Sequence, residues 1–156
     1  ITYLPTQEGF VYLASIIDLG SRRLLGWALD TSMPVDLVQR AFDQALKTRG
    51  KERLPGTILH SDQGSQYCSH VFQNRVRAAQ MRTSMSRKGE CWDNAVAESF
   101  WNTVKREVLG ARKRFLSISE AIEQTESWIS YYNAERPHSA IRMMAPLAYE
   151  AQLSKR

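Results

Sequence analysis

Two carboxylates, Asp62 and Glu98, have residue types and surroundings that could do chemistry together. Asp62 ends the segment TILHSD, residues 57–62, which begins as a short apolar strand and stops at a glycine-containing turn. Glu98 lies in a segment with helical spacing, and the 35 residues 63–97 separate the two acids. Carboxylates that converge at a strand end and a helix could bind hard divalent cations, and two such ions can assist phosphodiester displacement. Because Asp shortly before Gly is ordinary turn chemistry, a turn is the alternative for Asp62.

The predicted helix of Glu98 begins near Asp93, which can cap it, and runs to about Leu109. One face of it carries, at helical spacing, Glu98, then Trp101 or Asn102, and then Lys105. This face could hold a metal ion at the glutamate and contact the neighbouring phosphate through the lysine. A solvated charged face is the alternative for this helix taken alone.

The elements that position these residues follow from the changing period of the apolar residues. Three successive strands with short turns, an antiparallel meander, are predicted at 1–6, 10–19 and 22–30. Helices and short strands then alternate, with helices at 34–48 and 69–80 and strands at 57–62 and 81–86. A capping box, Ser117 with Glu120, opens a helix that runs to about Asn133. This order predicts an α/β fold with a mixed five-stranded sheet and helices on both faces.

Length and composition indicate one globular domain over 1–156, with a helical extension from about 117. The net charge of +5 favours a polyanionic partner. Two cysteines, Cys68 and Cys91, are too few for a disulfide framework and are expected to be reduced thiols in a cytosolic protein. No apolar run is long enough to span a bilayer, and no signal peptide is expected. Because Ile1 stands where an initiating Met would, the chain is expected to be part of something larger.

Three ordered blocks carry a resemblance to a known family: HSDQGSQY, SRKGECWDNAVAESFWNTVKRE and YYNAERPHSA. Together they closely resemble the catalytic core of bacterial insertion-sequence transposases, which are related to retroviral integrases. Residues 1–29 also resemble that family's opening meander, so the resemblance covers nearly the whole chain. It implies a ribonuclease H-like fold. It further implies DNA transposition or integration, with cleavage of DNA ends and strand transfer, by metal-dependent phosphoryl transfer at an Asp-Asp-Glu site.

By this likeness Asp62 is the second acid and Glu98 the third, and both would hold Mg²⁺ or Mn²⁺, with two ions in the complete site. Lys105 matches a helix position that contacts donor DNA in related integrases. Asn102 beside it, and Arg87 and Lys88 in a basic loop before the helix, are further candidate DNA contacts, although a solvated loop is equally expected. The implied partners are double-stranded DNA, as transposon ends and target, and further copies of the chain in a homo-oligomer. No membrane is implied, and the implied location is the bacterial cytoplasm, with the nucleoid.

One departure from the family concerns the first acid, which directly precedes the Ile-Thr-Tyr segment. Here that segment begins the sequence at Ile1, so the first acid is expected to be missing. Asp18 could substitute for it, but its place before Gly20 favours a turn-forming role. His138 could face the site or support packing, and both readings stay open.

Three alternatives to the complete enzyme follow from the same residues. The chain could be a catalytically incomplete core that folds and binds DNA, or a ribonuclease H-like nuclease. A zinc site is disfavoured, because its candidate ligands match no compact zinc signature: His60, Cys68, His70 and Cys91.

Overall fold

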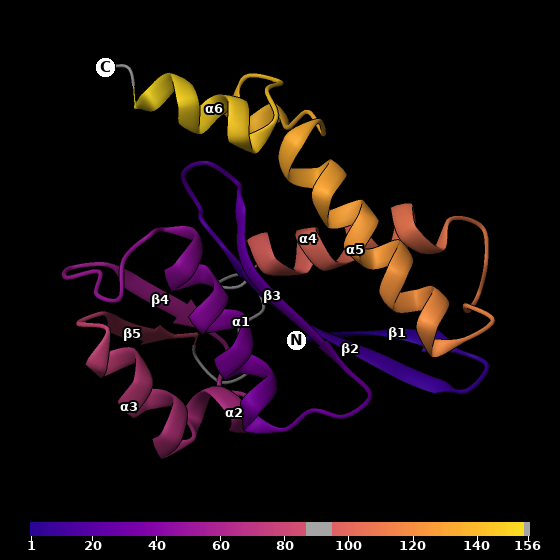
Figure 1. Cartoon of the computed structure of the whole chain (residues 1–156), viewed down its shortest axis with the longest axis horizontal. Helices are drawn as coiled ribbons and strands as arrows, with labels where there is room; N and C mark the ends of the chain where they lie inside the picture. Colours follow the sequence, from indigo (N-terminus) through magenta and orange to yellow (C-terminus); the bar gives the residue numbers. More distant parts are fainter. Residues whose placement is uncertain (87–94, 155–156) are drawn as a thin grey trace.

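The computed structural model describes residues 1–86 and 95–154, in which the strands form two hydrogen-bonded groups. The first group is the predicted antiparallel meander of β1 (Thr2–Thr6), β2 (Gly9–Ile17) and β3 (Leu24–Asp30) (Figure 1). In the second group, β4 (Ile58–Ser61) and β5 (Arg82–Met85) pair in parallel. Parallel neighbours need a crossover, and helix α3 supplies it here.

The helices occupy the segments where the apolar period predicted them, with additions. They are α1 (Val35–Thr48), α2 (Ser65–Cys68), α3 (His70–Ala78), α4 (Ala95–Val104), a π-helical turn (Lys105–Leu109), α5 (Ile118–Ala134), a 3₁₀ turn (Ser139–Ile141) and α6 (Pro146–Leu153). The capping box is confirmed at one bond, because the Ser117 hydroxyl accepts from the Glu120 backbone N–H at 3.1 Å. None of the helices described is long and apolar enough to cross a membrane.

Helices cover both faces of the meander, as predicted (Figure 1). On one face α1 packs so closely on β3 that a side chain at Gly26 would collide with the backbone of Ala41 and Ala45. On the other face α4 and α5 bury an apolar core with β1 and β2, to which Phe100, Val104 and Trp128 contribute. The class of fold is therefore the α/β arrangement that the sequence predicts.

The predicted single sheet of five strands is wrong in its pairing, because the described strands form separate ladders of three and two. The two groups are joined through side chains instead. Leu59 of β4 shares a core with Ala14, Ala28 and Phe42 of the meander and α1.

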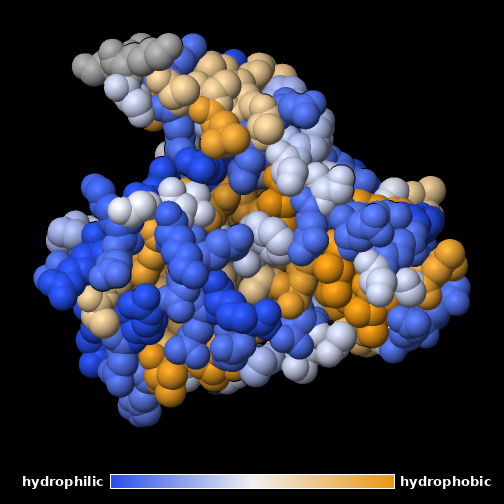
Figure 2. Space-filling model, viewed as in Figure 1, coloured by the Kyte–Doolittle hydropathy of each residue, from blue (hydrophilic) through white to orange (hydrophobic). Residues whose placement is uncertain are grey.

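The C-terminal helix α6 stands out from the rest of the molecule. In Figure 2 a concave notch separates this arm from the lobe that carries α1 and β4, whose visible surface is mostly hydrophilic. The exposed side chains of Leu147 and Leu153 fit a helix with little buried surface, in which Pro146 is the buried residue. Its attachment therefore depends on polar contacts, described below.

Candidate active site

Asp62 follows the last residue of β4 directly, as the sequence predicts. Its Oδ1 accepts a hydrogen bond from the backbone N–H of Gly64 at 2.8 Å. Asp62 therefore takes part in a turn, as the alternative interpretation predicted, and this turn holds the half-buried carboxylate at the end of β4. Within residues 1–86 and 95–154 this is the hydrogen bond that the Asp62 side chain makes, and it uses one of the two oxygens.

Helix α4 lies beside this strand end. A small pocket of about 40 Å³ has Asp62 and Tyr67 on one side and Ala97 and Trp101 of α4 on the other. The indole N–H of Trp101 donates to the Ser15 hydroxyl at 3.1 Å, which anchors the helix on β2. Folding thus brings Asp62 next to the residue that precedes Glu98.

Glu98 is exposed in the first turn of α4, and Asn102 is exposed one turn later. Phe100 and Val104 are buried on the opposite side. The ambiguity between Trp101 and Asn102 is resolved in favour of Asn102 for the outer face, since Trp101 turns inward. Among the described residues no three His, Cys, Asp or Glu side chains are grouped as metal ligands, and Glu98 does not line the small pocket that Asp62 lines.

The amino group of Ile1 lies in the same region. Its nitrogen is 3.5 Å from the Tyr67 hydroxyl. Burial lowers the pKa of this amino group to about 6, while the negative charge of Asp62 acts in the opposite direction. Burial also raises the pKa of Tyr67, and the Asp62 charge adds to that shift. The start of β1 and the end of β4 therefore meet close to Asp62.

Lys105 begins the π-helical turn, so the helix runs to Leu109 as predicted, with its last turn π-helical. Its ammonium lies 4.4 Å from the centre of the Tyr3 ring on β1. A π-turn widens the last part of a helix and is frequent at functional sites. Arg87, Lys88, Cys91 and the expected cap Asp93 lie outside the described residues.

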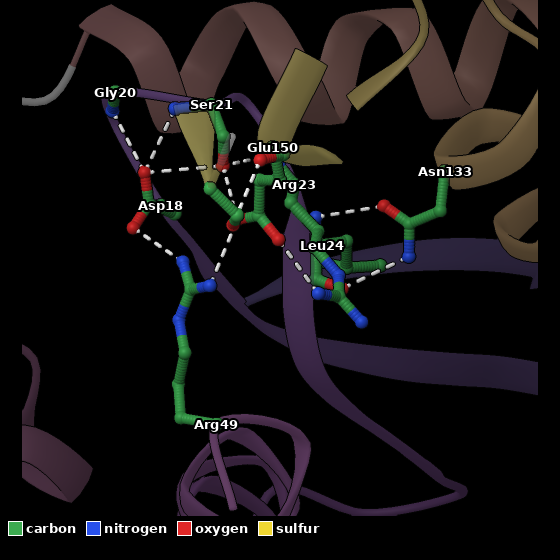
Figure 3. A network of polar contacts seen from close by, with 9 residues as sticks. Asp18, Gly20, Ser21, Arg23, Leu24, Arg49, Asn133 and Glu150 are labelled. Carbon is green, nitrogen blue, oxygen red and sulfur yellow. Dashed lines mark hydrogen bonds and ion pairs between the residues drawn. The ribbon is translucent and has the colours of Figure 1, made fainter. Parts of the chain in front are cut away.

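Asp18 has the turn-forming role that its position predicts, which is confirmed (Figure 3). Its Oδ1 accepts from the backbone N–H groups of Gly20 at 2.9 Å and Ser21 at 2.8 Å, and its Oδ2 pairs with Arg49 at 2.6 Å. Burial opposes ionisation of this carboxyl, but the hydrogen bonds from Ser21 and the charge of Arg49 outweigh it and lower the pKa. Both oxygens are thus engaged in structure, at the turn that follows β2.

The same network attaches α6 (Figure 3). Glu150 pairs with Arg23 at 2.7 Å and with Arg49 at 2.8 Å, and it accepts from the Ser21 hydroxyl at 2.8 Å. Sequence reasoning missed this carboxylate, because its partners lie more than a hundred residues away along the chain.

His138 lies on a different flank of α4 from Asp62. It lines a pocket of about 540 Å³ together with Ser99 and Thr103, and its ring packs edge-on against Tyr132 at 4.7 Å. Burial lowers its pKa to about 4, and the charges of Arg136 and Arg22 add to this effect. The structure thus favours packing over a place beside Asp62.

Two of the candidate zinc ligands, His60 and Cys68, are described by other contacts. Both ring nitrogens of His60 lie 3.1 Å from serine hydroxyls, those of Ser84 and Ser86. Cys68 is a free, exposed thiol. His60 therefore bridges β4 and the end of β5.

The fold is similar to that of the catalytic cores of retroviral integrases. The core domain of bovine immunodeficiency virus integrase matches with a TM-score of 0.66 at 16% identity, covering 99% of this chain and 94% of that one. The HTLV-2 integrase core in complex with magnesium matches with a TM-score of 0.63 at 16% identity, covering 94% and 88%. These likenesses confirm the ribonuclease H-like fold.

The chain belongs to the integrase core domain family, whose models match residues 1–91 and 79–146. A transposase for insertion sequence element IS904 of Lactococcus lactis is 43% identical over 96% of this chain and 58% of its own length. Transposase InsF for insertion sequence IS3A of Escherichia coli is 38% identical over 96% of this chain and 51% of its own length. The resemblance stated from the sequence is confirmed, and the chain spans little more than half of each relative.

Proposed function

We propose that this chain is the catalytic core of an insertion-sequence transposase, which cleaves DNA ends and joins them to a target by metal-dependent phosphoryl transfer. The observation that carries the proposal is the position of Asp62 against helix α4, one residue from Glu98 along that helix. The names of the relatives, which are transposases, support the same reaction.

Asp62 and Glu98 would hold the Mg²⁺ or Mn²⁺ ions. Their hard carboxylate oxygens fit such cations, one Asp62 oxygen is left by the turn, and Glu98 is exposed. The HTLV-2 core, a structural neighbour, was solved with magnesium. When bound, divalent ions supply activation of the attacking oxygen and stabilisation of the leaving oxygen. The protein residues orient these ligands, and Lys105 and Asn102 would contact the DNA backbone alongside them.

A third carboxylate would complete the proposed site if an Asp preceded Ile1. The Ile1 nitrogen is 3.5 Å from the Tyr67 hydroxyl, and Tyr67 lines a pocket with Asp62, so a residue attached to Ile1 would lie in the region of Asp62. With Asp62 and Glu98 alone, two negative charges face up to four positive ones, and their mutual repulsion is large. This favours, for the 156-residue chain by itself, weak binding of one ion and DNA binding with little cleavage.

The test is metal titration by calorimetry on four proteins: the chain, its Asp62→Asn and Glu98→Gln variants, and the chain extended by one Asp before Ile1. We expect weak Mg²⁺ binding that each substitution abolishes and the extension strengthens by about tenfold, since one added carboxylate is worth roughly 1.4 kcal/mol or more. Unchanged binding in both substituted variants would overturn the assignment of these acids.

We further propose that the chain binds double-stranded DNA and assembles with further copies of itself. The proposed location is the bacterial cytoplasm. The net charge of +5 supports a polyanionic partner. One structural neighbour is an intasome and another a dimeric integrase core, which supports oligomerisation. Sedimentation of the chain with and without duplex DNA tests both partners.

A further inference from the structure

Two aromatic rings stand exposed on the β1–β2 hairpin. Tyr3 is 51% exposed and Phe10 48% exposed, and their ring centres lie 5.3 Å apart in an edge-to-face arrangement. The strand register puts Tyr3 opposite Tyr12 and Phe10 opposite Pro5, so the rings lie on one face of the sheet. Helix α1 covers that face over β2 and β3. Tyr3 lies on the edge strand β1 and Phe10 near the start of β2.

Two elements connect Tyr3 with the region of the proposed catalytic site. Tyr3 is two residues from Ile1, whose nitrogen is 3.5 Å from the hydroxyl of Tyr67, and Tyr67 lines the same small pocket as Asp62. The Lys105 ammonium also lies 4.4 Å from the centre of the Tyr3 ring, in a cation–π contact. Lys105 is two helical turns from Glu98. Strand β1 therefore leads to Tyr3 from the region of Asp62, and the helix that carries Glu98 leads to it through Lys105.

The surface formed by Tyr3, Phe10 and Lys105 fits a nucleotide better than it fits an apolar patch of a second protein. An apolar patch of a second protein would have to bury the Lys105 ammonium, which is costly without a charged partner. A nucleotide offers a flat base for a ring and a phosphate for the ammonium in a single ligand. Exposed cation–π contacts are weak, so a phosphate can draw Lys105 from the ring and free that face for stacking.

We propose that Tyr3, supported from the side by Phe10, is a stacking platform for an unpaired nucleobase at the DNA end, while Lys105 contacts the phosphate beside it. This proposal rests on the proposed function, since it assumes that DNA binds at the Asp62 and Glu98 site. Base stacking on aromatic side chains tolerates any base and is a recurrent mode of binding single strands. Tyr3 would position the end and take no part in the chemical step.

The experiment separates stacking from phosphate contact. Fluorescence anisotropy compares a labelled duplex carrying a three-thymine overhang with the same duplex whose overhang is abasic, so that the phosphates are identical. We expect the chain to prefer the base-bearing overhang by about tenfold, from the usual size of base–aromatic stacking. Tyr3→Ala should abolish the preference and Tyr3→Phe should keep it. Lys105→Ala should weaken binding of both oligonucleotides to a similar extent.

Tyr131, which is 42% exposed on α5, provides a matched control. Tyr131→Ala should leave the preference intact, and thermal melting should show that every variant is folded. If Tyr3→Ala keeps the preference, or if the chain binds both overhangs equally, the platform is overturned while DNA binding stands. If the chain binds neither oligonucleotide, the proposed function fails with it. Dissociation of an oligomer by Tyr3→Ala, with base preference unchanged, would make the patch a contact between copies and overturn the proposal.

Discussion

The guanidinium of Arg136 forms a bidentate ion pair with the carboxylate of Glu107, which lies 29 positions earlier in the chain. Nη2 lies 2.7 Å from Oε1 and Nε lies 3.0 Å from Oε2, and the Trp128 indole N–H adds a third bond to Oε2 at 3.0 Å. The hydrogen bonds from Arg136 hold the pKa of Glu107 below its usual range. Arg136 of the Arg-Pro-His tail thus joins the end of α5 to the π-helical turn that follows the candidate catalytic helix.

Arg136→Ala is expected to lower the free energy of unfolding by about 1–3 kcal/mol, because hydrogen bonds to charged groups are the stronger ones. Urea unfolding measures this. Arg106 is the matched control, since it is 71% exposed and lies 3.6 Å from the same carboxylate. Arg106→Ala should cost less than about 0.5 kcal/mol, as exposed pairs do. Equal losses would mean that the bidentate geometry has no special weight.

His138 predicts a pH dependence of stability between its unfolded pKa of 6.5 and its folded pKa of about 4. In that window the unfolded chain binds a proton that the folded chain does not, so stability falls as the pH falls. His138→Gln should reduce the loss between about pH 7 and about pH 5 by roughly 1 kcal/mol, after allowance for solvent screening of the half-buried ring.

Urea unfolding at the two pH values checks this prediction. The unsubstituted chain, measured at the same two pH values, provides the reference. An unchanged slope in His138→Gln would show that the ring is as free to ionise in the folded chain as in the unfolded one.

Lys105→Ala should weaken duplex DNA binding and reduce the slope of log affinity against log salt by about 0.9, the value for one phosphate contact. Its melting temperature should barely change, since the contact with Tyr3 is worth only about 0.5–1 kcal/mol at an exposed site. A large loss of stability with unchanged DNA affinity would make Lys105 a structural residue.

DNA cleavage should depend on an Asp before Ile1. In a Mn²⁺-dependent assay on a substrate with cognate ends, the 156-residue chain should cut little, and the chain extended by that Asp should cut measurably. Glu98→Gln in the extended chain is the negative control. Equal activity of the two chains would show that another residue supplies the third ligand.

The sequence predicted best what depends on neighbours in the chain. The meander, the turn at Asp18 and the cap at Ser117 follow from short-range patterns, and each is present. One five-stranded sheet was predicted, whereas the described strands form two separate groups, because ladders between distant segments leave no local signal. Helix α2, four residues long, was missed for a related reason, since it is too short to show a period.

In the candidate site, too, the positions of residues within their own elements were predictable from the sequence, whereas contacts between distant elements were not. Asp62 at a strand end and Glu98 on a helix were readable from pattern and resemblance. The inward turn of Trp101 was not, because its hydroxyl partner Ser15 lies 86 positions away. The contact of Lys105 with Tyr3 was equally hidden, since a helical wheel shows which residues share a face and not what faces them.

The network around Glu150 has a consequence for the order in which the protein assembles during synthesis. The meander and α1 leave the ribosome early and can pair among themselves, whereas Glu150 emerges 129 residues after Ser21. Until it arrives, Arg49 has Asp18 but lacks its second carboxylate, and Arg23 lacks the partner it has at 2.7 Å in the finished fold. Helix α6 therefore docks after the meander and α1, and a chain halted before Glu150 would leave Arg23 without its carboxylate partner.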